Sequence, residues 1–397
     1  MQPSARDDFH VAINAHLLSG QDSYRSAGVH QYIHHLLRHL PQADDRMRCT
    51  VLLGAGAFPL DIALDSLRSR WPTGRPTLRV PWEQLVQPWA LRQIEVDLVH
   101  CPAFVGPLVA PCPLVITIHD LSFIRFPELF RPANRLYLTV MTRLSARRAR
   151  RLIAVSAHAA AETAHLLNVP PERIDVVYHG VEPDFHPLSA DEIATFCRRK
   201  ELPERFVLFV GTLEPRKNLV RLVEAFALVR DDRVRLVLAG GKGWLYDKLF
   251  ARVESLGLSE KVIFAGYVPN EELPLWYNAA TILAYPSLYE GFGLPVLEAQ
   301  ACGTPVLTSN VSSLPEAAGD AALMVEPHDV EALTEGLNQL LADKGLRQEL
   351  RGRGLVHAGQ FSWPHAAQET ARVYRRALAE GLVLSADETS GVEGGET

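Results

Sequence analysis

The stretch FVLFVGTLEPRKNLVRLVEAFALV, residues 206–229, predicts the fold of its half of the chain. The apolar run Phe206–Val210 has the length and β-branched content of a buried strand, and Leu219–Val229 repeats apolar residues at helical spacing. The turn between them carries Arg216 and Lys217. A strand, a short turn and a helix make up the repeating unit of a parallel sheet with crossover helices.

The same alternation extends in both directions from this stretch. Strands are also expected at Phe9–Ala15, Cys49–Leu53, Val96–His100, Leu114–Ile118, Leu152–Val155, Asp175–Val177, Val234–Ala239, Val262–Ala265, Thr281–Tyr285, Pro305–Thr308 and Ala321–Val325. Helices are expected at Val29–Leu40, Arg135–Arg151, Leu245–Leu256, Leu294–Ala301 and Val330–Ala342. We therefore expect an α/β protein with two Rossmann-like, doubly wound domains that face a central cleft.

The length of 397 residues is typical of two domains. A polar, charged stretch at Ser189–Glu204 interrupts the alternation and predicts a linker near residues 183–200. The first domain is expected at 1–185 and the second at 200–360. A final helix at about 363–382 is expected to pack back on the first domain, and the polar, acidic end at 385–397 is expected to be disordered.

Composition excludes several classes of protein. The net charge of -6 argues against nucleic acid as a partner, and five scattered cysteines without a Cys-x-x-Cys pair argue against disulfides and zinc. The longest uncharged stretch, Pro102–Ile118, contains too many prolines to form a membrane-spanning helix. These features predict a soluble cytoplasmic protein that needs no metal.

Ligands of open α/β sheets bind beyond the carboxyl ends of the strands. One such segment, Tyr289–Glu298, has Glu290 in a glycine-containing loop and Glu298 on the helix that follows. The first backbone N–H groups of that helix would attract an anion. The alternative is that both glutamates are simply solvated, as most surface glutamates are.

Three other positions follow strands in the same way. Arg216 and Lys217 form a pair of cations suited to a diphosphate, and the alternative is a solvated dipeptide. His119 ends an apolar strand and could bond a sugar hydroxyl or a leaving phosphate, or else a loop carbonyl in a structural role. Gly28 precedes the first helix, where N–H groups could meet phosphate, which by itself is weak evidence.

The combination of these motifs resembles the retaining glycosyltransferases of family 4, which have the GT-B fold. The resemblance rests on residues 289–298 and on GTLEPRKN at 211–218, and it extends over about residues 9 to 380. Shorter matches are Ile153–Ser156, His179–Glu182 and Ala301–Val306.

The resemblance implies a role for each site residue. Glu298 would hold the ribose hydroxyls and Glu290 would face the donor sugar. The remaining contacts to the nucleotide-diphosphate sugar would come from Gly28, His119, Gly211, Thr212, Arg216, Lys217, Phe292, Gly293 and Leu294. Two positions depart from the family pattern: Thr212 replaces a frequent Arg, and Ala27 replaces the first glycine of a Gly-Gly pair.

The implied activity is that of a hexosyltransferase with a nucleotide-diphosphate sugar as donor and no cofactor. The motif at 211–218 and Pro81–Gln84 look most like the mannosyltransferase branch, which favours GDP-mannose, although UDP-sugars stay open. The expected acceptor is a glycan or a lipid-linked sugar. The alternatives are a UDP-dependent glucosyl or N-acetylglucosaminyl transferase, an epimerase or a phosphorylase on the same scaffold, and a non-catalytic nucleotide-sugar-binding subunit.

One charged feature bears on localisation. Five arginines cluster at helical spacing and predict a basic stripe that docks on anionic lipid at the inner face of a membrane, the alternatives being a solvated helix face or a site for a charged acceptor. The five are Arg143, Arg147, Arg148, Arg150 and Arg151.

Overall fold

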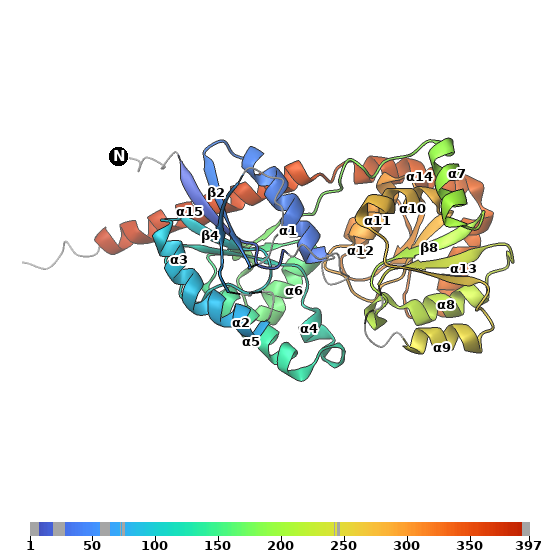
Figure 1. Ribbon diagram of the computed structural model, residues 1–397, viewed down its shortest axis with the longest axis horizontal. Coiled ribbons are helices and arrows are strands. Elements are labelled where there is room, and N and C mark those ends of the chain that lie inside the picture. Colours follow the sequence, from blue (N-terminus) through green and yellow to red (C-terminus); the bar gives the residue numbers. More distant parts are fainter. Residues whose placement is uncertain are drawn as a thin grey trace, which may run out of the picture. The chain divides into compact units, whose positions relative to one another are not determined.

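The computed structural model describes residues 8–18, 28–55, 64–71, 73, 76–241, 243 and 247–390. The chain divides into two compact units, each built on one sheet (Figure 1). Unit 1 comprises residues 1–178 and 363–397, and unit 2 comprises residues 179–362. The chain therefore leaves unit 1 after Tyr178 and returns to it at Trp363.

Unit 1 contains a parallel sheet in the order β3-β2-β1-β4-β5-β6-β7. Its strands are β1 (Phe9–Asn14), β2 (Met47–Leu53), β3 (Asp65–Arg68), β4 (Leu98–Cys101), β5 (Leu114–Ile118), β6 (Arg151–Ala154) and β7 (Ile174–Val176). The strand order reverses between β1 and β4, which makes the sheet doubly wound.

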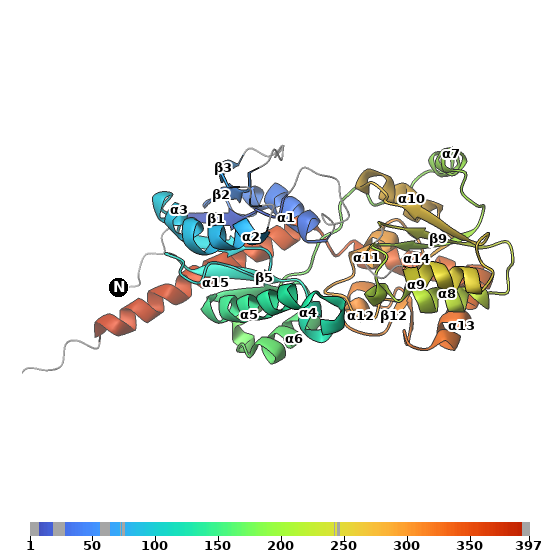
Figure 2. The same ribbon diagram turned by 60° about the horizontal axis from the view of Figure 1, so that its bottom comes forward.

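Helices cover both faces of this sheet (Figure 2). They are α1 (Gly28–His39), η2 (Leu40–Gln42), α2 (Pro76–Pro81), the π-helical turn η3 (Trp82–Val86), α3 (Gln87–Gln93), α4 (Ser122–Arg125), η4 (Pro127–Leu129), α5 (Pro132–Arg148), α6 (Ala157–Leu167), η5 (Pro171–Arg173) and α15 (Trp363–Ser390). Alternate residues of β1 enter different cores: Val11 and Ile13 pack with α1 and α15, and Ala12 packs with η3 and α5.

The last helix, α15, completes the core of unit 1. Its Trp363 and Tyr374 are buried in the same cluster as Val11 and Ile13. Two carboxylates hold the buried Arg151 of β6: the Nε atom of Arg151 lies 2.5 Å from Asp175, and its NH1 atom lies 2.5 Å from Glu380 of α15. The end of the chain is thus joined to unit 1 by apolar packing and by ion pairs.

Unit 2 contains a second parallel sheet in the order β10-β9-β8-β11-β12-β13. Its strands are β8 (Phe206–Val210), β9 (Arg235–Ala239), β10 (Val262–Gly266), β11 (Ile282–Tyr285), β12 (Val306–Ser309) and β13 (Leu323–Val325). Its helices are α7 (Ala190–Lys200), η6 (Pro215–Lys217), α8 (Leu219–Ala227), α9 (Asp247–Ser255), η7 (Asn270–Glu272), α10 (Leu273–Ala279), α11 (Leu294–Ala301), α12 (Leu314–Ala318), α13 (Val330–Ala342) and α14 (Lys344–Ala358).

The predicted α/β class with two doubly wound sheets is confirmed, two local expectations were wrong, and one strand was missed. The expected linker forms α7, which starts with a capping box between Ser189 and Glu192 and buries Phe196. The tail expected from residue 385 instead continues α15 as far as Ser390, and residues 391–397 lie outside the described part of the chain. The exposed edge strand β3 was not predicted at all.

The predicted stripe of five arginines is also wrong in part. Helix α5 ends at Arg148, so Arg150 and Arg151 do not belong to it. Arg150 donates from NH1 to the carbonyl oxygen of Ala377 at 3.0 Å, and Arg151 is buried in β6. The remaining three arginines are exposed on α5.

Candidate active site

The loops that follow β8 and β11 lie at the carboxyl edge of the unit 2 sheet. These two strands are neighbours, and the chain proceeds from β8 to β9 on one side and from β11 to β12 on the other. The strand order therefore reverses between β8 and β11. α/β sheets bind ligands at the carboxyl edge beside such a reversal. One loop carries Arg216 and Lys217, and the other carries Glu290.

The loop after β8 is shaped by a close approach of two backbones. A Cβ atom on Gly240, at the end of β9, would lie 1.9 Å from the carbonyl oxygen of Gly211. The N–H of Leu213 then donates to the carbonyl oxygen of Gly241 at 3.0 Å. The chain continues into η6 and reaches Asn218, whose positive φ of 61° ends that turn. This path directs Lys217 toward β11.

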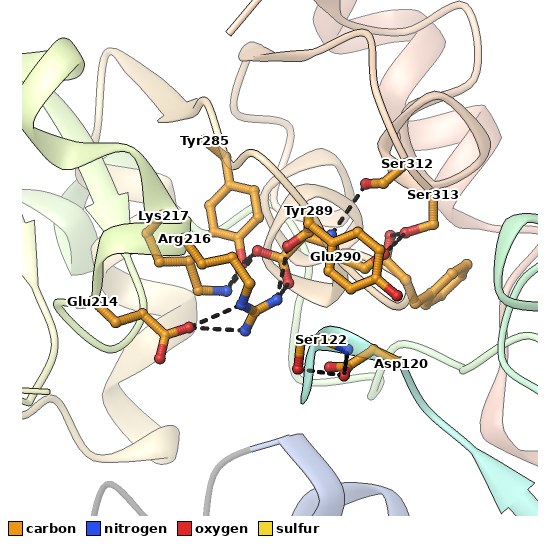
Figure 3. Close-up of polar contacts among 11 residues, drawn as sticks. Asp120, Ser122, Glu214, Arg216, Lys217, Tyr285, Tyr289, Glu290, Ser312 and Ser313 are labelled. Atoms are coloured by element: carbon orange, nitrogen blue, oxygen red, sulfur yellow. Dashed lines mark hydrogen bonds and ion pairs between the residues drawn. The ribbon is translucent and has the colours of Figure 1, made fainter. Parts of the chain in front are cut away.

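Glu290 accepts hydrogen bonds from three side chains (Figure 3). The Nζ atom of Lys217 lies 2.6 Å and the hydroxyl of Tyr285 lies 3.0 Å from its Oε1 atom. The NH1 atom of Arg216 lies 3.1 Å from its Oε2 atom. Lys217 also donates to the Tyr285 hydroxyl at 2.8 Å, so lysine, phenol and carboxylate form a closed triangle.

Arg216 is held from its other side by Glu214. The Nε and NH2 atoms of Arg216 lie 3.1 and 2.8 Å from the Oε1 atom of Glu214, and NH1 donates to the carbonyl oxygen of Tyr289 at 2.7 Å. Two cations and two carboxylates therefore balance one another. Both cations already point at anionic groups, and guanidinium and ammonium groups bind phosphate as well as carboxylate.

Nearby charges outweigh burial in setting the pKa of Glu290. Burial would raise the pKa of this carboxyl, but the charges of Lys217 and Arg216 and their hydrogen bonds lower the pKa to about 2. Burial lowers the pKa of Lys217, and the nearby Glu290 carboxylate opposes that effect. Glu290 is ionised at every physiological pH, so it acts as a fixed anion rather than as a proton donor.

Two serines hold the Glu290 loop in place. The N–H of Glu290 donates to the Oγ atom of Ser312 at 3.0 Å, and the hydroxyl of Ser313 lies 2.9 Å from the carbonyl oxygen of Glu290 and 2.8 Å from that of Phe292 (Figure 3). Gly293 has a φ of 117°, a backbone angle that residues other than glycine rarely adopt. The loop thus reaches α11 in one defined conformation.

Glu298 lies on α11 in quite different surroundings. Its Oε2 atom accepts a hydrogen bond from the hydroxyl of Tyr277 at 2.7 Å. Burial raises the pKa of Glu298 to about 7, and the bond from Tyr277 only partly offsets that effect. Glu298 therefore changes its charge near neutral pH, whereas Glu290 does not.

The start of α11 offers fewer N–H groups than predicted. Pro295 has no N–H, and the N–H of Val296 donates to the carbonyl oxygen of Gly293 at 3.0 Å. An anion at this helix start would therefore depend on the backbone groups of Phe292, Gly293 and Leu294 rather than on those of Pro295 and Val296. The predicted backbone contacts from Phe292, Gly293 and Leu294 stay a prediction.

The two predicted residues of unit 1 lie in different surroundings. The Nε2 atom of His119, which follows β5, is 2.8 Å from the carbonyl oxygen of Pro102, and the buried ring packs edge-on against Tyr32. Burial lowers the pKa of His119. This carbonyl contact is the one expected of a structural histidine. Gly28 begins α1 with a φ of 30°, and its neighbour Ala27 lies outside the described residues.

Several residues of the cluster were not predicted. Tyr285 ends β11, so the rule that picks residues at strand ends could have found it. Glu214 lies inside the GTLEPRKN motif but was not assigned a role there. Ser312, Ser313 and Tyr277 gave no signal in the sequence. Across the described ranges, no group of three or more His, Cys, Asp or Glu side chains is arranged to hold a metal ion, and independence from metal stays a prediction.

Family models match both halves of the chain. The model for glycosyl transferases group 1 matches residues 194–355, and the model for Glycosyltransferase Family 4 matches residues 26–185. The chain is also 38% identical over 294 residues to O-antigen chain mannosyltransferase B of Escherichia coli, an alignment that covers 73% of this chain and 77% of that protein. The chain belongs to the family 4 glycosyltransferases. It is a hexosyltransferase with the predicted GT-B fold.

The chain is also similar to a second mannosyltransferase and to a solved structure. The serotype-specific mannosyltransferase WbdA of Escherichia coli is 33% identical over 62% of this chain, which spans 31% of that longer protein. The solved structure of HepE from Anabaena, in complex with UDP and glucose, has a TM-score of 0.73 and 21% identity, and covers 92% of this chain and 99% of that one. The second likeness shows the fold alone.

Proposed function

We propose that this glycosyltransferase moves mannose from GDP-mannose to a glycan or lipid-linked acceptor and retains the anomeric configuration. The observation that carries the proposal is the pair Arg216 and Lys217, oriented by Glu290 at the switch point of the unit 2 sheet. The choice of mannose is supported by the 38% identity to a mannosyltransferase. Glu298 would accept the ribose hydroxyls, and the cations would bind the diphosphate.

In the proposed reaction the bond between the anomeric carbon and the diphosphate oxygen breaks, and the electron pair leaves with the diphosphate. The acceptor oxygen bonds to the same face of the anomeric carbon, and its proton passes to the departing phosphate oxygen. Arg216 and Lys217 stabilise the charge that develops on the diphosphate. Glu290 is a poor candidate for a covalent nucleophile, because both of its oxygens already accept charged hydrogen bonds.

The test is a panel of nucleotide diphosphates and nucleotide sugars screened for thermal stabilisation of the full chain. GDP and GDP-mannose should raise the melting temperature more than UDP and UDP-sugars do. Incubation of the preferred donor with candidate acceptors, followed by NMR of the product, then reports the linkage and its anomeric form. An inverted product would contradict the retaining mechanism, and preference for UDP would contradict the donor.

A UDP-sugar is the second candidate donor. The sequence motifs leave UDP-sugars open, and HepE, whose fold this chain shares, was solved with UDP and glucose. A reaction without acceptor separates the remaining alternatives: an epimerase would convert the donor sugar in the absence of acceptor, a phosphorylase would require phosphate, and a non-catalytic subunit would bind the donor without turnover.

A further inference from the structure

Helix α5, which lies beside α4 and α6 (Figure 2), has an unusual outward face. A helix on a protein surface normally turns polar residues to water. On α5 the positions opposite its buried Thr142, Ser145 and Ala146 carry three aliphatic side chains at successive i, i+4 positions. Leu136, Val140 and Leu144 are 66%, 44% and 40% exposed.

The charges on α5 all have one sign. On the helical projection Arg147 falls between Leu136 and Val140, Arg143 lies directly beside Leu136, and both arginines are exposed. The whole helix, PANRLYLTVMTRLSARR, contains no aspartate or glutamate. This local positive charge contrasts with a net charge of -6 for the chain.

The loop next to the C-terminal end of α5 carries another exposed aliphatic side chain. Val109 is 67% exposed. Its loop is bonded to α5 by Arg148, whose NH2 atom lies 3.3 Å from the carbonyl oxygen of Ala110. The same loop is bonded to η3, because the side chain of Gln84 contacts Gly106 and Leu108. We call the surface formed by Val109, Leu136, Val140, Arg143, Leu144 and Arg147 the docking face.

We propose that the docking face binds the surface of a bilayer that contains anionic lipid. Exposed aliphatic side chains interleaved with arginines suit the boundary between headgroups and acyl chains, where the apolar groups leave water and the guanidinium groups meet phosphate. A second copy of the chain suits this face less well, since self-pairing would bring arginines together with no acidic residue of α5 to balance them.

The inference goes beyond sugar transfer and does not depend on the identity of the donor. The docking face also replaces the predicted stripe of arginines. It leaves out Arg148, Arg150 and Arg151 and adds the aliphatic residues. No described helix is long and apolar enough to cross a membrane. Contact with a bilayer would therefore be peripheral as far as the described residues are concerned.

The experiment measures co-sedimentation of the full chain with vesicles of neutral phosphatidylcholine, alone or with about 30 mol% phosphatidylglycerol. The wild type should sediment with the anionic vesicles only. Two variants test the two components of the face separately: Leu136→Ser with Val140→Ser and Leu144→Ser, and Arg143→Gln with Arg147→Gln. Each should lower the partition coefficient by about tenfold or more, the equivalent of ~1.4 kcal/mol.

A matched control removes exposed aliphatic side chains from unit 2, where Leu228 and Val356 are 61% and 72% exposed. Leu228→Ser with Val356→Ser should bind vesicles as the wild type does. Equal sedimentation with neutral and anionic vesicles, or full binding by either docking-face variant, would overturn the proposal. Light scattering could also overturn the proposal, if it showed a wild-type dimer that the docking-face substitutions convert to monomers. The docking face would then bind a second copy of the chain.

The nucleotide-induced thermal shift, measured on the same variants, keeps the two proposals distinct. Wild-type shifts in both docking-face variants would show that they fold and that unit 2 is intact. Loss of vesicle binding with a normal nucleotide response supports the docking face alone. Failure of every nucleotide to stabilise the wild type would count against the proposed donor and leave the vesicle result standing.

Discussion

Glu290 and Glu298 lie on either side of the start of α11, and their surroundings shift their pKa values in opposite directions. Burial would raise the pKa of Glu290, but the charges of Lys217 and Arg216 outweigh burial and lower this pKa to about 2. Burial raises the pKa of Glu298 to about 7, and the hydrogen bond from the Tyr277 hydroxyl only partly offsets that effect. Carboxylates with such different pKa values can have different roles at one pH: Glu290 orients the two cations, and Glu298 is proposed to accept the ribose hydroxyls of the donor.

Replacing Lys217 with alanine should lower kcat about 10²–10³-fold, because one charge that stabilises the leaving diphosphate is lost. The measurement is steady-state turnover with a saturating donor. Lys248→Ala, on the exposed start of α9, is the matched control and should leave kcat unchanged. Unchanged turnover in Lys217→Ala would refute the assignment. The melting temperature should be recorded as well, since the substitution leaves Glu290 with one cation fewer.

Glu298 should couple donor binding to pH. Its folded pKa of about 7 lies above the reference value of 4.5, so its contribution to stability is present below about pH 4.5 and is lost as the pH rises through 7. Glu298→Gln should therefore raise the melting temperature relative to wild type at pH 8 more than at pH 5. A donor that bonds the ionised carboxylate should release a proton near pH 7, measurable by calorimetry in buffers of different ionisation enthalpy, and the variant should release none. Proton release that persists in the variant would assign it to another group.

Tyr285→Phe should weaken the triangle formed with Lys217 and Glu290. The phenol contacts both partners from a fully buried position, so its removal should cost about 1 kcal/mol of unfolding free energy. Because Tyr285 acts through Lys217, kcat should fall while the dissociation constant for donor changes little. Tyr267→Phe, at a half-exposed tyrosine, is the control for both measurements. A variant that loses stability but keeps full kcat would limit Tyr285 to a structural role.

The sequence predicted the charged residues of the site better than the residues that orient them. Arg216, Lys217 and Glu290 stand next to strand ends and within recognisable motifs, and the structure brings all three together. Ser313 acts through a bond to backbone carbonyls more than twenty positions away, which no local pattern encodes. The predicted meeting of His119 and Gly28 with the residues of unit 2 stays a prediction.

Secondary structure elements were predictable where burial imposes a pattern. β5, β8, α11 and α13 have the expected bounds, because each is an apolar run or a regular amphipathic repeat. β3 consists of four exposed residues, so no hydrophobic pattern marks it. α7 has a polar sequence that resembles a linker and gains its stability from capping and from packing on α10.

The close approach of Gly211 and Gly240, which follow β8 and β9, leads to a prediction at the scale of the elements. Gly240→Ala should prevent the two loops from closing, because the added Cβ would overlap the carbonyl oxygen of Gly211. The expected result is a lower melting temperature together with the loss of nucleotide-induced stabilisation. Gly352→Ala is the control: it lies in α14 with no atom within 4 Å of an added Cβ, and it should stabilise the protein by about 0.5–1 kcal/mol. A normal nucleotide response in Gly240→Ala would contradict the close approach.

At the scale of the whole molecule, unit 1 depends on both ends of the chain. Deleting residues 363–397 removes Trp363 and Tyr374 from the unit 1 core and leaves the core of unit 2 unchanged. The truncated chain should show cooperative melting and nucleotide binding only for unit 2, as followed by circular dichroism and limited proteolysis. Residues 179–362 produced alone should melt at the same temperature. Two intact transitions in the truncated chain would contradict a structural role for α15.

The return of α15 to unit 1 also sets an order for synthesis on the ribosome. Residues 9–178 emerge first, yet one face of their sheet is only partly covered, by α1, until α15 has left the exit tunnel. Unit 2, which is contiguous in sequence, can close while translation continues. Unit 1 is thus translated first but completes its fold last. Until α15 packs on it, its exposed apolar surface can be bound by a chaperone.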